Sequence, residues 1–274
     1  MQTDAIILDD ESTWPLALTR ILHQHAVLLQ QYEEEKIRII QLCENNRIYQ
    51  ARPPENVYEQ RQKNIVAEVE CLLRGGTMIG YHCTRLHDEE IADILDRGLS
   101  PLSLELVERR IRRLQMAGTL TEVIAQHLIQ HNWTDDRSRQ QGGRSGMVWF
   151  LLTRSLLRSE DGIGISSLFR SWGGEALYAC HEDKPEISSV LERIGTPCIV
   201  EAILAVDAIV GSVIGEKLVC GFLHRRRVKI IDEHEAQGYV ETPVAGQRIL
   251  SVIKRSHPDF EQLTACSAWS LPLQ

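Results

Sequence analysis

The sequence lacks several features that would place a chain in a class at once. Its seven cysteines are odd in number and scattered, and no C-x-x-C pair occurs. This usage predicts reduced thiols in a cytosol rather than a disulfide framework. No run approaches the roughly eighteen consecutive apolar residues of a membrane span. The acidic N-terminus has no basic and apolar blocks of a signal peptide, so we expect a cytoplasmic location and no membrane partner.

An excess of positive charge is also missing. The formal net charge is −8 and the isoelectric point is about 5.7, which argues against a protein coated in positive charge for duplex DNA. Three basic clusters nevertheless occur, at Arg109–Arg113, Arg137–Arg144 and Arg225–Lys229. Each fits either a solvated surface or a rim that holds the phosphates of a cofactor or a nucleic acid.

Common catalytic and metal-binding signatures are absent too. Neither G-x-S-x-G nor H-E-x-x-H occurs. His82, Cys83 and His87, or Cys180 with His181, match no standard zinc spacing, and adjacent residues of a strand point apart. We therefore expect no metal site.

What is present predicts a folded α+β protein. Hydrophobic residues make up 43% of the chain and charged residues 25%, which is ordinary for a chain with a core. Apolar spacings of three and four predict helices at 12–46 and 58–76, separated by Pro53-Pro54. Strands with interspersed helices, without regular βαβ alternation, follow. The predicted strands are 77–84, 146–153, 196–210, 225–232 and 238–244, and the predicted helices between them include 89–99 and 103–131. We expect two domains, a helical N-terminal region at 1–76 and a second domain at 77–274.

The end of the first predicted strand carries unusual polar residues. It reads Tyr-His-Cys-Thr-Arg at 81–85. Side chains alternate along a strand, so His82 and Thr84 share one face, while Arg85 lies on the other. From spacing alone, His82 is either a hydrogen-bonded core residue or part of a site.

Residues 81–99, YHCTRLHDEEIADILDRGL, resemble the first motif of ADP-ribosyltransferases of the diphtheria-toxin and poly(ADP-ribose)-polymerase type. The apolar strand at 148–150, the segment SWGGEALY at 171–178, and the pattern YV…PV…RIL at 239–250 resemble the later motifs in the same order. The resemblance covers roughly 77–255. It implies a split core of two small packed sheets, with the N-terminal helical region before it and a helical insertion around 100–140.

The resemblance also implies a chemistry. Enzymes of this family cleave the nicotinamide–ribose bond of NAD, their substrate, and pass ADP-ribose to an acceptor through an oxocarbenium-like transition state. It implies that His82 hydrogen-bonds the ribose next to the nicotinamide and that Thr84 supports this contact. It implies that Tyr178 stacks on the nicotinamide ring. A glutamate on the late strand would bind the ribose 2′-hydroxyl and stabilise the developing positive charge.

The position of that glutamate departs from the family pattern. The expected slot, before Tyr239-Val240, holds Gly238. Glu241 is our first choice, and the alternatives at this point are Glu235, Glu175 and Glu201. A carboxylate on a buried apolar strand requires a partner or a function, which favours Glu201 and Glu241 over Glu235. The departure leaves open a protein that binds NAD weakly or not at all.

Other candidate residues have two interpretations each. Trp172, in the segment SWGGEALY, belongs either to the core or to a wall of the nicotinamide pocket, with Glu175 facing the ligand or the acceptor. Arg85 and Arg170 are either surface residues or partners of the pyrophosphate.

The sequence-based hypothesis is an NAD-dependent mono-ADP-ribosyltransferase that modifies a macromolecule, either a protein or RNA or DNA. By analogy with the family it is an intracellular toxin or defence effector with an antitoxin or chaperone partner. The alternatives are an inactive binding or scaffold protein with the same fold and an NAD glycohydrolase.

Overall fold

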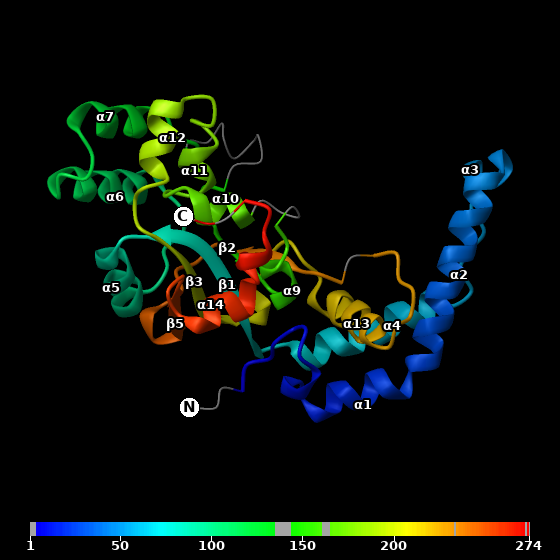
Figure 1. The fold of residues 1–274 in the computed structure, drawn as a ribbon. Coiled ribbons are helices and arrows are strands. Elements are labelled where there is room, and N and C mark those ends of the chain that lie inside the picture. The colour runs from blue at the N-terminus through cyan, green and yellow to red at the C-terminus, as the bar shows by residue number, and fades with distance from the viewer. Residues whose placement is uncertain (1–3, 135–143, 161–164, 233, 272, 274) are drawn as a thin grey trace. The chain divides into compact units, whose positions relative to one another are not determined.

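The computed structural model describes residues 4–134, 144–160, 165–232, 234–271 and 273 (Figure 1). The chain divides into two compact units, which are described separately. The first comprises Met1–Ile79, Ala205–Asp207 and Gly211–Ala236, and the second comprises Gly80–Leu204, Ala208–Val210 and Gln237–Gln274. The domain boundary at residue 76 stays a prediction.

The first unit is mainly helical. The predicted helix at 12–46 is interrupted at His25, whose backbone (φ −104°, ψ 9°) separates two helices. The predicted helix at 58–76 is confirmed as α4. The strand predicted at 225–232 is wrong, because Leu218, Phe222 and their buried neighbours recur at helical spacing and form a helix that continues to Arg225. The helices are η1 (Glu11–Thr13), α1 (Leu16–Gln24), α2 (Ala26–Asn45), α3 (Arg47–Ala51), α4 (Glu59–Leu73) and α13 (Ile214–Arg225).

The described residues of the chain form one five-stranded antiparallel sheet in the order β4-β2-β1-β3-β5. The predicted α+β class is confirmed. One sheet replaces the two small sheets that we expected, because β1 is hydrogen-bonded along both edges and joins β2 on one side to β3 on the other. The strands are β1 (Thr77–Leu86), β2 (Val148–Leu151), β3 (Thr196–Ala205), β4 (Gln237–Val240) and β5 (Ile249–Lys254). Strand predictions at 77–84, 146–153, 196–210 and 238–244 are thus confirmed in position, with shorter bounds for three of them.

Helices of the second unit build a core of their own beside the sheet. The helical region predicted at 103–131 is two helices, α6 and α7, and in Figure 1 they gather with α12. Apolar side chains of these helices enclose Trp172 and Leu191, both fully buried. The helical elements of this unit are α5 (Asp88–Arg97), α6 (Leu104–Met116), α7 (Glu122–Gln130), α9 (Arg154–Leu157), α10 (Ile165–Arg170), α11 (Glu175–Tyr178), α12 (Pro185–Leu191), η3 (Gly246–Arg248), α14 (Pro258–Thr264) and η4 (Cys266–Ala268), with η2 (Val206–Ala208) at the boundary of the two units.

Two local features follow from the sequence around β1. The acidic residues that open α5 form a capping box, in which the Glu90 carboxylate accepts the backbone N–H of His87 at 2.8 Å. The paired glycines before α11 have positive φ, +92° at Gly173 and +61° at Gly174, a conformation that favours glycine. Both features lie at the edge of the cavity described below. Across the part of the chain that the structure describes, no helix combines the length and apolar character needed to cross a membrane.

Candidate functional site

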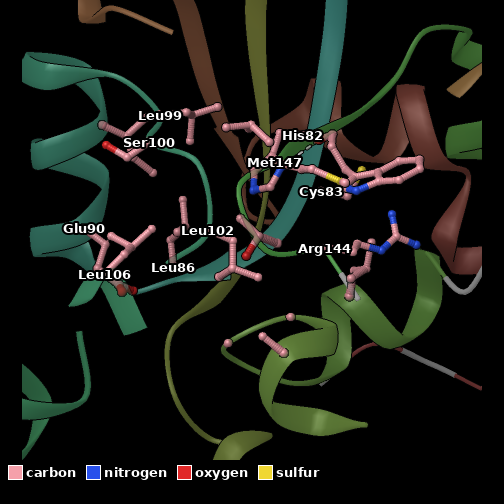
Figure 2. Close-up of a pocket in the computed structure, with 18 of the residues that line it drawn as sticks. His82, Cys83, Leu86, Glu90, Leu99, Ser100, Leu102, Leu106, Arg144 and Met147 are labelled. Carbon is pink, nitrogen blue, oxygen red and sulfur yellow. Dashed lines mark hydrogen bonds between the residues drawn. The ribbon is translucent and has the colours of Figure 1, made fainter. Parts of the chain in front are cut away.

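A cavity of about 260 Å³ lies in the second unit, against the C-terminal half of β1. Its walls come from β1, α5, α6, β2 and the glycine turn before α11. In the view of Figure 2, aliphatic side chains such as Leu102 and Leu106 lie on one side, Arg144 lies on the other, and His82 lies between them. His82 and Thr84 both line the cavity, together with their strand neighbours Tyr81 and Cys83.

His82 is held as a neutral base. Its Nδ1 lies 2.8 Å from the carbonyl oxygen of Trp149, so this nitrogen carries the proton and donates it. Burial lowers the pKa of the imidazole, and the positive charges of Arg110 and Arg144 lower it further, against the opposing effect of the hydrogen bond to Trp149. Among the described residues, Nε2 has no hydrogen-bond partner, and it is not enclosed. Nε2 is thus an acceptor available to a molecule in the cavity.

The two residues after His82 are less reactive. Thr84 is buried, and its hydroxyl donates a long hydrogen bond (3.4 Å) to the carbonyl oxygen of Arg85. Burial raises the pKa of the Cys83 thiol far above its usual range. A thiol with a raised pKa is a poor nucleophile and a poor metal ligand. Chemistry at this end of β1 therefore depends on His82.

Arg144 and Glu175 form the second feature of the wall. Arg144 pairs with the Glu175 carboxylate through Nε and through Nη2, the latter at 2.9 Å. The same guanidinium lies over the ring of Trp149, with 4.1 Å from Cζ to the ring centroid. Trp149 in turn contacts Tyr239 across the β2–β4 pair, with 5.0 Å between ring centroids. This arrangement connects a carboxylate, a cation and an aromatic ring within one wall.

Glu90 on α5 is the centre of the opposite wall. Its carboxylate accepts hydrogen bonds from Arg110 at 2.6 Å and from the indole Nε1 of Trp172 at 2.9 Å. Burial alone would raise the pKa of Glu90, but the charge and hydrogen bond of Arg110, with the N–H groups of His87 and Trp172, lower it below the usual range. Glu90 is therefore ionised and fully engaged.

The cavity is more positive than the rest of the chain. Its described lining contains five arginines and three carboxylates, namely Arg97, Arg109, Arg110, Arg113, Arg144, Glu90, Asp93 and Glu175. The chain as a whole carries a net charge of −8. The described lining carries more positive than negative side chains, and a concave surface concentrates the potential of such an excess. The cavity consequently favours an anionic ligand.

Several residues predicted for the site lie elsewhere. Arg85 is buried on the other face of β1 and donates to three backbone carbonyls, those of Ile194, Phe169 and Gly195, at 3.0, 3.0 and 2.9 Å. Arg170 donates to the carbonyl of Leu271 at 2.6 Å. Arg85, Arg170, Trp172 and Tyr178 are not among the described residues that line the cavity. The described lining instead contains the aromatic residues Tyr81, Trp149 and Phe150, with Arg144 stacked on Trp149.

The predicted glutamates are similarly divided. Glu175 lines the cavity, whereas Glu235, Glu241 and Glu201 do not appear among its described lining residues. Glu241 is exposed in the turn after β4, Glu235 belongs to the first unit, and Glu201 accepts a hydrogen bond from Ser251 at 2.7 Å.

The start of β4 is the place where the resemblance led us to expect a catalytic glutamate. A Cβ at Gly238 would lie 2.8 Å from the carbonyl oxygen of Val210, so no side chain fits there without a shift. The preceding residue, Gln237, opens β4 and lines the cavity. Sequence reasoning missed Gln237, although its place as the first residue of the late strand could have indicated it.

A histidine cluster lies outside the cavity. The rings of His127 and His131 stack with centroids 4.3 Å apart, and the fully buried His181 lies 5.2 Å from His127. His181 Nε2 is 3.0 Å from the carbonyl oxygen of His131, and its Nδ1 is buried without a described partner. In the part of the chain that is described, no group of three or more histidine, cysteine, aspartate or glutamate residues could hold a metal ion.

This cluster predicts an acid-dependent loss of stability. Burial lowers the pKa of His181 below the usual 6.5, with the nearby Lys184 and His127 adding to the effect. The unfolded chain therefore takes up a proton at a higher pH than the folded chain. Stability is fully present above about pH 6.5 and is lost below it, by at most about 1.4 kcal/mol per pH unit for one histidine.

The measurement is urea unfolding of the wild type and of His181→Gln between pH 7.5 and 5.5. The variant cannot protonate at this position, so its stability should depend less steeply on pH. Parallel curves for the two proteins would contradict the assignment.

No protein-family model, curated protein or solved structure matches this chain.

Most of the basic cluster at 137–144 lies outside the described residues, and Arg144 is its described member.

Proposed function

We propose that the protein is an NAD-dependent mono-ADP-ribosyltransferase whose second unit has an ADP-ribosyltransferase-like fold. The observation that carries this proposal is the neutral imidazole of His82, with Nε2 available inside a positively charged cavity. A neutral acceptor fits a ribose hydroxyl, and arginines fit the diphosphate of a dinucleotide. The motif at 81–99, which resembles the first family motif, supplies this histidine.

The proposed roles follow the geometry. His82 Nε2 accepts a hydrogen bond from a hydroxyl of the ribose that carries nicotinamide. Arg144, fixed between Glu175 and the Trp149 ring, faces the diphosphate. The bond between ribose C1′ and the nicotinamide nitrogen breaks, nicotinamide leaves with the bonding electrons, and an acceptor nucleophile attacks C1′ and loses its proton to water. We assign the stabilisation of the positive charge to Glu175, because its carboxylate is paired with the single side chain of Arg144 among the described residues, whereas Glu90 is engaged by three separate donors.

An inactive binding protein is the second candidate, and one observation favours it. The residue that opens β4 and lines the cavity is the amide Gln237 rather than a carboxylate. An amide can hydrogen-bond a ribose hydroxyl, but it cannot neutralise an oxocarbenium charge. An NAD glycohydrolase would release free ADP-ribose. The transferase would instead attach ADP-ribose to an acceptor, and the binding protein would produce none.

The test is to incubate the purified chain with NAD labelled in its adenylate part, with and without a bacterial lysate. Label in macromolecules supports the transferase, and its sensitivity to nuclease or to protease identifies the acceptor class. Free ADP-ribose in equal amount with and without lysate would instead indicate a glycohydrolase. No NAD consumption by folded protein would leave the binding function. The expected toxin or defence role, with its antitoxin or chaperone partner, stays a prediction.

Glu175→Gln is expected to lower NAD turnover about 10²–10³-fold, because the charge facing the developing cation is lost while the shape is kept. Single-turnover NAD consumption measures this. The control is Glu241→Gln, which changes an exposed glutamate outside the cavity and should retain wild-type turnover. The opposite pattern would restore Glu241 as the catalytic carboxylate and remove Glu175.

A further inference from the structure

Two arginines of the cavity, Arg97 and Arg109, form no close ion pair with a described lining carboxylate, although their charges help to lower the pKa of Asp93. Arg110 pairs with Glu90, Arg113 with Asp93, and Arg144 with Glu175. Arg109 has no ion pair with any described residue. Among the described residues, the ion pair of Arg97 is with its neighbour Asp96, at 3.5 Å, and both side chains are largely exposed (78% and 79%). Exposed pairs of this kind are weak, so both guanidinium groups remain available to an anion.

These arginines lie on two helices that line the cavity. Arg97 is the last residue of α5, and Arg109 lies on the exposed side of α6, whose opposite face packs into the core through Val107 and Ile111. Both line the same cavity. Leu99, Leu102 and Leu106 line its neighbouring wall, and Figure 2 shows them on the side away from Arg144. The rim therefore combines free cations with an apolar recess.

A nucleotide of a polymer has the matching chemistry, a phosphate beside a flat and largely apolar base. Guanidinium groups bind phosphate through two parallel hydrogen bonds. A base can enter a recess only from a single strand or after leaving the stack of a duplex. The net charge of −8 repels a polyanion overall, so binding requires a local group of positive charges such as this rim.

We propose that the macromolecular acceptor is a single-stranded nucleic acid, whose phosphates contact Arg97 and Arg109 while one base enters the recess lined by Leu99, Leu102 and Leu106. This inference rests on the proposed transferase function. It assigns the substrate class, which the reaction at His82 does not.

The experiment measures binding in the absence of NAD, by the fluorescence anisotropy of labelled oligonucleotides of mixed sequence at 50 and 200 mM salt. The probes are a single-stranded RNA, a single-stranded DNA, and the duplex of the latter. A glutamate-rich peptide serves as the competitor for the protein-acceptor alternative. The proteins are the wild type, the double variant Arg97→Ala with Arg109→Ala, and a matched control, Arg193→Ala with Arg248→Ala. The control removes two exposed arginines of the same unit that are not among the described residues lining the cavity.

We expect the wild type to bind a single strand more tightly than the duplex. Loss of two phosphate contacts should weaken binding about tenfold at low salt and reduce the slope of log affinity against log salt by about 1.4. The control should retain the wild-type affinity and slope. Tighter binding of RNA or of DNA identifies the strand.

Three results would overturn the inference: no binding of a single strand by the wild type, equal loss in the double variant and the control, or displacement of the strand by the acidic peptide. Because NAD is absent, these results are separate from the transferase test. NAD turnover with no strand binding would leave the chemistry in place and point to a protein acceptor. Strand binding without NAD turnover would remove the transferase proposal and keep a nucleic-acid-binding cavity.

Discussion

His82→Ala is expected to lower NAD turnover about 10²–10³-fold, the range found when one positioned polar contact to a transition state is removed. The reason is the geometry of the ring. Its Nδ1 is fixed by the Trp149 carbonyl at 2.8 Å, so Nε2 is directed and unprotonated at neutral pH. Loss of this internal hydrogen bond should reduce the free energy of unfolding by only about 1 kcal/mol. Activity therefore falls far more than stability.

The measurements are single-turnover NAD consumption and urea unfolding of the same preparations. His257→Ala is the control, because His257 is an exposed histidine of the same unit that is not among the described cavity residues. The pH dependence of NAD turnover by the wild type provides a second readout. Because the pKa of His82 lies below 6.5, turnover should hold at neutral pH and decline only on acidification below that value. Unchanged turnover in His82→Ala would exclude a role for this ring in NAD chemistry.

Arg85→Ala is expected to lower the free energy of unfolding by about 3 kcal/mol, because three carbonyls, those of two buried residues and of the partly buried Gly195, each lose a hydrogen bond worth about 1 kcal/mol. The side chain joins β1 to the backbone at Phe169, Ile194 and Gly195. Arg170→Ala, by contrast, removes one described hydrogen bond to Leu271 and an ion pair with Glu160 at 3.8 Å, from a partly exposed side chain. That change should reduce stability by less than about 1 kcal/mol.

Urea unfolding of both variants compares a structural arginine with a surface arginine. From the sequence, both residues were either surface arginines or partners of the pyrophosphate. If Arg85→Ala kept wild-type stability but bound NAD more weakly, the ligand role would be restored and the structural role rejected.

The parts of the fold that could be predicted are those with a local pattern. The strand at 77–84 was found because its apolar run ends at a turn and an acidic helix start, and α5 was found from its acidic first turn and Gly98. The strand predicted at 225–232 was wrong. Its alternating valine, lysine and isoleucine are typical of a strand, but the segment follows a helix that ends at Arg225 and does not belong to the described five-stranded sheet. The arrangement of the strands in a single sheet could not be predicted, because the order of strands depends on contacts between segments that are distant in the sequence.

The site follows the same division. His82 and Thr84 were predicted to share one face of β1, and both line the cavity, but Tyr81 and Cys83 line it as well, so the assignment of faces stays a prediction. The role of Arg85 was not readable, because its three carbonyl partners lie 84, 109 and 110 residues further along the chain. The sequence predicted Arg109, Arg110 and Arg113 only as part of a charged helix. Their contacts with α5 could not be predicted, because no local pattern indicates that α6 packs beside α5. Gln237 was not predicted, because the family pattern requires a carboxylate at this strand start and an amide carries no charge.

The three contacts of Glu90 have a consequence for how this sequence can change over time. Its carboxylate serves the backbone of His87, the guanidinium of Arg110 and the indole of Trp172. A glutamine at position 90 would leave a buried cation without its counter-charge, and an apolar residue would leave all three donors without an acceptor. No single second substitution repairs both losses. Positions 90, 110 and 172 should therefore be exchanged together or not at all, so that among descendants of this sequence the three residues are inherited as one unit.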